Sequence, residues 1–243
     1  MRFATKLLVT ATIAVSITTT AAASTISFTG IGTMGGLPVN VSADLVTGDG
    51  MVTVTLNNLQ ANPSSVIQGL SDFGFSIKGI TNPAASLASS TGHELNITDS
   101  GTFAVAPGAV DTGWELTTPS SGPFAHGVYL NVVGTGIGPA HVILGPPNSS
   151  TNLYDATGGG SIQGNQAHNP FLASGASFTI NVAGVTADTL IQSVIFSFGT
   201  AAGNNLDGTC SRGCGGDQVP EPVTALLLGG GLIMIEAVRR RRG

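Results

Sequence analysis

The sequence is short of charge, above all positive charge. Only 9% of its 243 residues are charged, and it has 8 Lys and Arg in total. A typical soluble domain carries about 25% charged residues. Because phosphate contacts need lysine and arginine, this scarcity disfavours nucleic acid or an anionic membrane surface as a partner. The chain is nevertheless 42% hydrophobic, which argues against disorder, so Ser, Thr, Asn and Gly must form much of the solvent-facing surface.

Catalytic and cofactor-binding motifs are missing as well. The sequence has no G-x-S-x-G, no P-loop and no H-E-x-x-H. A G-x-G-x-x-G run from Gly30 to Gly35 is followed by Pro38 and an alternating strand pattern, so we interpret it as a turn. The four histidines are scattered along the chain: His93, His126, His141 and His168. We expect no enzymatic activity, no cofactor and no metal site, although the acidic pair of a secreted hydrolase would leave no mark in a sequence.

The first 23 residues have the features of a secretory signal peptide. Arg2 and Lys6 precede an apolar core from Leu7 to Ile17, which is 11 residues long and too short for a stable span. Small residues then lead to a predicted cleavage between Ala23 and Ser24. An uncleaved N-terminal anchor is the alternative.

The last 25 residues, 219–243, predict a short membrane helix. Pro220, Glu221 and Pro222 precede an apolar stretch over 223–238, which would be about 24 Å long as a helix, against roughly 30 Å of bilayer core. Glycines 229–231 weaken that helix. The chain then closes with a basic cluster that favours a cytoplasmic location for this end: Arg239, Arg240, Arg241 and Arg242.

These three features, in this order and at the extreme C-terminus, resemble the PEP-CTERM sorting signal of proteins secreted by Gram-negative bacteria with exopolysaccharide systems. The resemblance covers about a tenth of the chain. It implies recognition through Pro220, Glu221 and Pro222 by an exosortase-type membrane enzyme, with the arginines as the cytoplasmic stop signal. It also implies transient inner-membrane association, then a cell-surface or extracellular location with exopolysaccharide as a potential partner. A permanent single-pass anchor is the alternative.

Removing both ends would leave 195 residues, 24–218, with two basic and eleven acidic residues and a net charge of −9. This length fits one domain with a sizeable core. We assign 24–203 to that domain and 204–218, which is rich in Gly and Asn, to a linker. Cys210 and Cys214 lie in the linker, and export would favour a disulfide between them.

Alternation of apolar and polar residues predicts about ten short strands. The clearest runs are Val39–Leu45, Val52–Leu56 and Phe73–Ile77, and a Thr-Gly-Asp-Gly turn over 47–50 joins the first two. Residues 86–101 and 146–170 have the composition of loops. The remaining predicted strands lie in 24–30, 102–105, 114–117, 128–133, 141–144, 178–182 and 194–198. The pattern predicts an all-β fold, an antiparallel sandwich or jelly roll.

We weigh three functions for this domain. The first is a non-enzymatic surface or matrix protein, favoured by targeting signals around a domain poor in motifs. The second is a carbohydrate-binding or adhesive module, for which Trp114 is a stacking candidate, although a lone Trp usually packs in the core. Ice binding belongs to this second class, but the sequence has no regular Thr-x-Thr ladder. A secreted hydrolase is the third.

Residues 204–208 offer oxygen ligands for Ca²⁺, yet a solvated turn explains them better.

Overall fold

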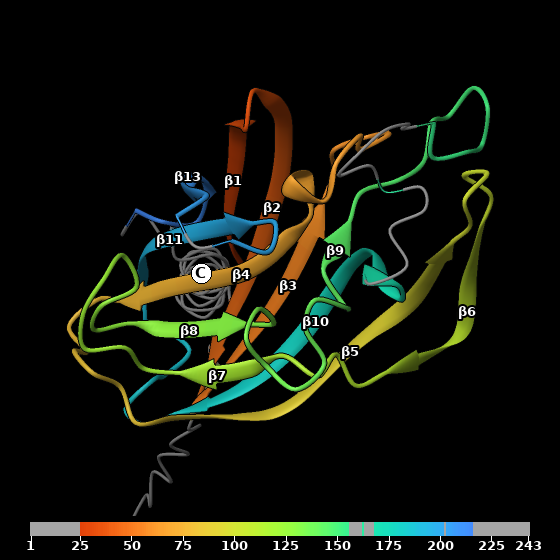
Figure 1. The fold of residues 1–243 in the computed structure, drawn as a ribbon. Coiled ribbons are helices and arrows are strands. Elements are labelled where there is room, and N and C mark those ends of the chain that lie inside the picture. The colour runs from red at the N-terminus through yellow and green to blue at the C-terminus, as the bar shows by residue number, and fades with distance from the viewer. Residues whose placement is uncertain (1–24, 156–161, 163–167, 202, 216–243) are drawn as a thin grey trace, which may run out of the picture.

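The computed structural model describes residues 25–155, 162, 168–201 and 203–215 (Figure 1). Within these ranges the chain is all-β, with a short 3-10 helix, η1 (Val66–Gln68), between the third and fourth strands. The strands are β1 (Thr25–Met34), β2 (Leu37–Gly48), β3 (Met51–Asn58), β4 (Leu70–Ile77), β5 (Ala85–Ile97), β6 (Phe103–Val110), β7 (Glu115–Thr117), β8 (Val128–Asn131), β9 (Ile143–Leu144), β10 (Phe171–Val182), β11 (Ile191–Phe198), β12 (Asn205–Asp207) and β13 (Thr209–Arg212).

All thirteen strands belong to one sheet. Its main path runs β12-β11-β4-β9-β10-β3-β2-β1-β13, with β5 and β6 branching from β10, and β8 and β7 branching from β4. Every pairing is antiparallel except that of β9 with β10, where Leu172 and Ala173 lie beside Ile143 and Leu144 in parallel register. The all-β expectation is therefore confirmed, and the sheet is continuous and mixed.

The two ends of this path are consecutive in the sequence. A single residue, Gly208, separates β12 from β13, and its amide donates a hydrogen bond of 2.9 Å to the carbonyl of Val194 on β11. Because β12 pairs with β11 and β13 pairs with β1, the sheet must roll until its first and last strands meet. Leu206 of β12 accordingly packs over Gly30 and Gly32 of β1.

Rolling the sheet creates two arms that enclose one core. We call β13, β1, β2, β3, β10, β5 and β6 the first arm, and β12, β11, β4, β8 and β7 the second arm. Along β3, fully buried Val52, Val54 and Leu56 alternate with partly exposed residues, as a sheet with one solvated face requires. Aromatic side chains fill the interior, and Phe73 and Phe196 of the second arm lie 5.4 Å apart between ring centroids.

Residues 204–215 correct the predicted linker. They form β12 and β13, so the domain extends past residue 203, and Ser27 of β1 lies opposite Arg212. The sequence pattern does not predict these short strands, because only Leu206 is apolar in β12 and all four residues of β13 are exposed. Pairing to existing strand edges, rather than burial, fixes them. Gly213 lies against the carbonyl of Thr25, so both ends of the described domain leave from the same corner.

The predicted loop at 86–101 is also wrong, because most of it belongs to β5. Leu95 and Ile97 are buried in the core, whereas Ser86, Ser89 and Thr91 face outward. These hydroxyl side chains made the segment resemble a loop in composition. β-branched and small residues at the outward positions are nevertheless compatible with a strand whose other face is buried.

Two predicted segments lie outside the described residues. They are the signal peptide, 1–23 with its cleavage position at Ser24, and the tail, 219–243. Among the residues that the structure describes, no helix has the length and apolar character needed to cross a membrane.

The contact at Gly208 predicts a stability change. A Cβ there would lie 2.3 Å from Val194 Cγ2 and 3.0 Å from Phe196 Cε2. We expect Gly208→Ala to lower the free energy of unfolding by about 1–3 kcal/mol, because overpacking forces buried side chains to move. Chemical denaturation measures this change. The control is Gly108→Ala, where a Cβ meets nothing within 4 Å and an effect within about 0.5 kcal/mol is expected. Equal effects of the two variants would contradict the tight closure.

Candidate functional site

The outer side of the first arm carries an array of hydroxyl and amide side chains, which we call the hydroxyl face. Its residues alternate with the buried ones on five neighbouring strands, so they all point away from the core. They are Thr25, Ser27 and Thr29 of β1, Ser42 and Asp44 of β2, Thr53, Thr55 and Asn57 of β3, Ser177 and Thr179 of β10, and Ser89 and Thr91 of β5.

Strand register arranges these side chains in rows across the sheet. One row contains Ser27, Asp44, Thr55, Ser177 and Thr91, each opposite the next. Neighbouring residues in a row are about 5 Å apart, and successive rows are about 7 Å apart along the strands. No Thr-x-Thr ladder runs through the sequence as a repeat, yet pairing assembles a grid of polar side chains from five separate strands, which Val46 interrupts in the row from Thr25 to Ser89.

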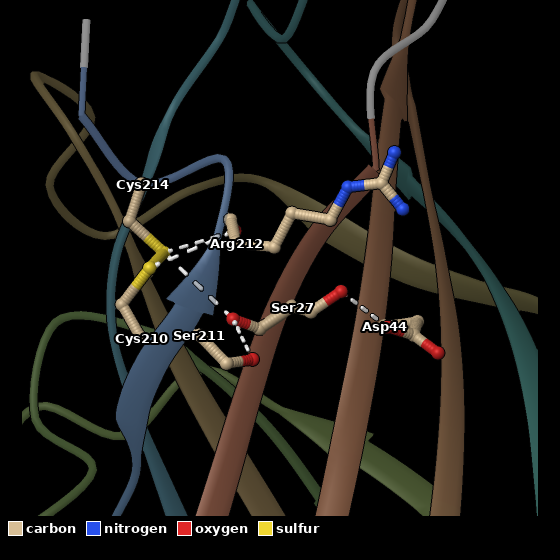
Figure 2. The surroundings of a disulfide bond; sticks show 6 residues. All are labelled: Ser27, Asp44, Cys210, Ser211, Arg212 and Cys214. Atoms are coloured by element: carbon tan, nitrogen blue, oxygen red, sulfur yellow. Dashed lines mark hydrogen bonds between the residues drawn. A yellow bond between two sulfur atoms is a disulfide. The ribbon is translucent and has the colours of Figure 1, made fainter. Parts of the chain in front are cut away.

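Hydrogen bonds fix part of this grid. Ser27 Oγ donates to Asp44 Oδ1 at 2.5 Å, and the hydroxyls of Thr55 and Ser177 are 3.4 Å apart. Figure 2 shows the edge of the face, where Arg212 of β13 extends beside Ser27. The face therefore has one acidic residue, with one basic residue at its edge, and its other hydrogen-bonding groups are uncharged. Val46 of β2 also lies on this side, between Thr25 and Thr53.

The outer side of the second arm has a different character. Strand register places Asn205, Ser197, Asp72, Asn131 and Glu115 in one row across β12, β11, β4, β8 and β7. Beside this row, the ring of Phe124 stacks on Tyr129 with 4.1 Å between centroids and covers Gly74. The ring of Phe124 borders a groove of about 70 Å³.

Asp72 is the one titratable residue of this row that is buried, with 7% of its surface exposed. Its Oδ2 accepts a hydrogen bond of 3.2 Å from Ser71 Oγ, while Oδ1 has no hydrogen-bond partner among the described residues. Burial raises the pKa of Asp72, and the polar groups of Ser197, Ser71 and Tyr129 oppose that rise. The pKa of Tyr129 is raised as well, first by burial and then by the neighbouring charge of Asp72.

Trp114, the candidate for stacking on a sugar, is instead part of the core. Only 3% of its surface is exposed, and its ring lies 5.2 Å from that of Phe178. Its indole Nε1 donates a hydrogen bond of 3.0 Å to the carbonyl of His141. The stacking hypothesis is wrong because the chain just before β7 turns this residue inward, between the two arms.

One of the four histidines meets a carboxylate within the described ranges. His141 Nε2 lies 3.3 Å from Glu94 Oε1, and Nδ1 lies 2.8 Å from the carbonyl oxygen of Thr112. Since both ring nitrogens already face oxygen atoms, this histidine has no free nitrogen with which to activate a serine hydroxyl. The other three bind single oxygens in separate places: His93 that of Ala106, His126 that of Asn82 and His168 that of Pro139.

The cysteine pair is present as a disulfide. Cys210 on β13 is bonded to Cys214 just beyond it (Figure 2), which confirms the predicted pairing. Beside it, Ser211 Oγ donates a hydrogen bond of 3.1 Å to the carbonyl of Ser27. Residues 204–208, weighed as a Ca²⁺ loop, contribute β12 and Gly208. In the described part of the chain, no three His, Cys, Asp or Glu side chains gather as metal ligands would.

The predicted sorting residues Pro220, Glu221 and Pro222, together with Arg239, Arg240, Arg241 and Arg242, lie outside the described residues, as do Ala23 and Ser24. No protein-family model, curated protein or solved structure matches the chain.

Asp72 predicts a pH dependence of stability. A carboxyl whose pKa is raised in the folded state contributes stability that is fully present below the unfolded pKa of about 3.9 and is lost as pH rises through the folded pKa. The loss is about 1.4 kcal/mol for each pH unit that separates the folded pKa from the unfolded one. We expect Asp72→Asn to remove this loss. Denaturation midpoints between pH 3.5 and 8 measure the slope. Asp207→Asn, which removes an exposed acid from the same face, controls for net charge, and an unchanged slope in Asp72→Asn would contradict the assignment.

Proposed function

We propose that the chain is an exported, non-catalytic protein of the cell surface or extracellular matrix, in which the two arms act as the layers of a β-sandwich. Its tail would be a PEP-CTERM-type signal, handled by an exosortase-type membrane enzyme and holding the protein at the inner membrane until processing. The delivery part of this proposal stands on the sequence features of the two ends.

The observation that carries the proposal is the disulfide at the end of the last strand. Disulfides form and persist in oxidising compartments outside the cytoplasm, and Cys210–Cys214 lies directly before the predicted sorting tail. Gly213 and Thr25 lie together at one corner of the domain. This arrangement supports a domain whose two targeting segments leave from the same side.

The proposal predicts the ends of the mature protein. Intact-mass and peptide mass spectrometry of protein from the producing cells should show a start at Ser24 and loss of Arg239–Arg242. A Pro220→Ala and Glu221→Ala double variant should keep the arginines, because the recognition motif is gone. Wild-type protein that retains its tail in cells with an active sorting peptidase would contradict processing, and a retained residue 1–23 segment would contradict export.

A second candidate function, binding of a neutral polysaccharide, is favoured by the hydroxyl face. A neutral, polyhydroxylated chain can exchange hydrogen bonds with rows of Ser, Thr and Asn, and it meets no net charge there. An anionic polysaccharide would instead be repelled by a domain with a net charge of −9 and only Lys78 and Arg212 as cations. The partner we propose is therefore a neutral exopolysaccharide of the surrounding matrix.

Lysine substitutions in the centre of the face test this function. We expect Thr53→Lys and Thr55→Lys each to weaken binding to purified neutral matrix polysaccharide about threefold or more, because one lost hydrogen bond costs about 0.5–1.5 kcal/mol and the long side chain holds the ligand away. Affinity electrophoresis or sedimentation with the polysaccharide measures it. Ser193→Lys on the second arm adds the same charge away from the face and should bind like wild type. Equal binding by all three variants would contradict this function.

A further inference from the structure

We infer that Asn96 is an acceptor site for an N-linked glycan. The sequence contains three Asn-x-Ser/Thr triplets without a central proline, which begin at Asn40, Asn96 and Asn148. Such a triplet on the surface of an exported protein is an acceptor for asparagine-linked glycosylation. The inference rests on the proposed function in one respect, because the modification requires export.

The structure separates the three triplets by the state of the asparagine amide. Asn148 donates a hydrogen bond to Asp155, and its Oδ1 accepts a 2.9 Å bond from the amide of Ser150, so its side chain is engaged. Asn40 is partly buried between β1 and β3. Asn96 is exposed, and its side-chain amide makes no hydrogen bond within the described ranges. It is the only one of the three that is both accessible and unengaged.

The backbone around Asn96 presents the whole triplet to solvent. Ile97 is anchored inward with 2% exposure, and the side chain of Asn169 clamps it by accepting from its amide at 3.1 Å and donating to its carbonyl at 2.8 Å. Since side chains alternate along a strand, Asn96 and Thr98 lie on the opposite, outward side, and both are exposed. The acceptor amide and the Thr98 hydroxyl thus share one exposed side, where the hydroxyl also hydrogen-bonds to Thr102 within the hairpin.

There is also room for a sugar. Ala104 of β6, opposite Asn96 across the hairpin, is small and exposed. An open hollow of about 510 Å³ adjoins the site and is lined by Asn96, Ile97, Thr98, Asp99, Ser100 and Asn169. The hollow offers space for the first saccharide units beside the acceptor amide.

The reaction needs one co-reactant, a glycan linked through its anomeric carbon to a lipid pyrophosphate. Asn96 Nδ2 forms a bond to the anomeric carbon, and the bond from that carbon to the phosphate oxygen breaks. The lipid pyrophosphate leaves with the bonding electron pair, and the amide gives up one proton to the transferase. Nothing is oxidised or reduced.

The experiment begins with the full chain isolated from its producing cells. Intact-mass spectrometry should show a mature protein that starts at Ser24 and is heavier than its sequence by one glycan, which electron-transfer fragmentation should locate on Asn96. Asn96→Gln and Thr98→Ala should each abolish the added mass completely. Thr98→Ser, Asn40→Gln and Asn148→Gln should retain it. Thr98→Ser keeps the hydroxyl, so it separates loss of the acceptor motif from a change in local structure.

Two outcomes overturn the inference: a mature protein that starts at Ser24 but carries no glycan, and a glycan that persists in Asn96→Gln. If residues 1–23 are instead retained, export has failed, and the purified full chain is then incubated with a bacterial oligosaccharyltransferase and a lipid-pyrophosphate-linked oligosaccharide. Glycosylation at Asn96 in that reaction supports the acceptor site even though the delivery proposal is lost, and its absence overturns the acceptor site as well.

Discussion

The structure depends on the closure of the sheet at Gly208. One residue links the strand that ends the second arm to the strand that ends the first, so the main path of the sheet has no free end that could uncurl independently. Because Gly208 has no side chain, Val194 and Phe196 can pack directly against the backbone that links β12 to β13. Because a rolled sheet turns one face of every strand toward a common interior, this closure explains why residues from β1 to β11 share a single core. It also limits the exposed strand edges that invite pairing with other chains.

The outer faces of the rolled sheet contact water, and the chain has few charged residues with which to keep them soluble. The first arm does so with hydroxyl and amide groups that stand in register, and only Asp44 and Arg212 interrupt their neutrality. Ser and Thr suit this position, because β-branched and small polar residues fit a pleated surface and hydrogen-bond to water or to a ligand. The acidic residues lie mostly elsewhere, including Asp72 and Glu115 of the second arm. The negative charge of the domain and the neutrality of the hydroxyl face are therefore properties of different surfaces.

The alternation of apolar and polar residues predicted those strands whose inward positions are strongly apolar, such as Val39–Leu45 and Val52–Leu56. It missed β5, whose outward Ser and Thr resemble a loop, and β12 and β13, which are too short to show a period. The hydroxyl face could not be foreseen for another reason. A row such as Ser27, Asp44 and Thr55 exists only once strand register is known, and register joins residues that are far apart in sequence. A signal was present, since hydroxyl residues occupy alternate positions in several strands. No sequence pattern indicated that Asp72 is buried.

Strand register also orders the proposed features along the domain. Ser89 of β5 lies in the same row as Thr25 of β1, through Val46, Thr53 and Thr179. Asn96 follows Ser89 by seven residues, a distance of about 20 Å along an extended strand. The corner where the chain enters and leaves and the hairpin that carries Asn96 are thus at opposite ends of the first arm, with the hydroxyl face between them. In the proposed arrangement, a tail held at the membrane keeps Asn96 far from the bilayer and leaves the hydroxyl face open along its side. A glycan on that hairpin would therefore extend into the matrix without covering the surface that we propose to contact it.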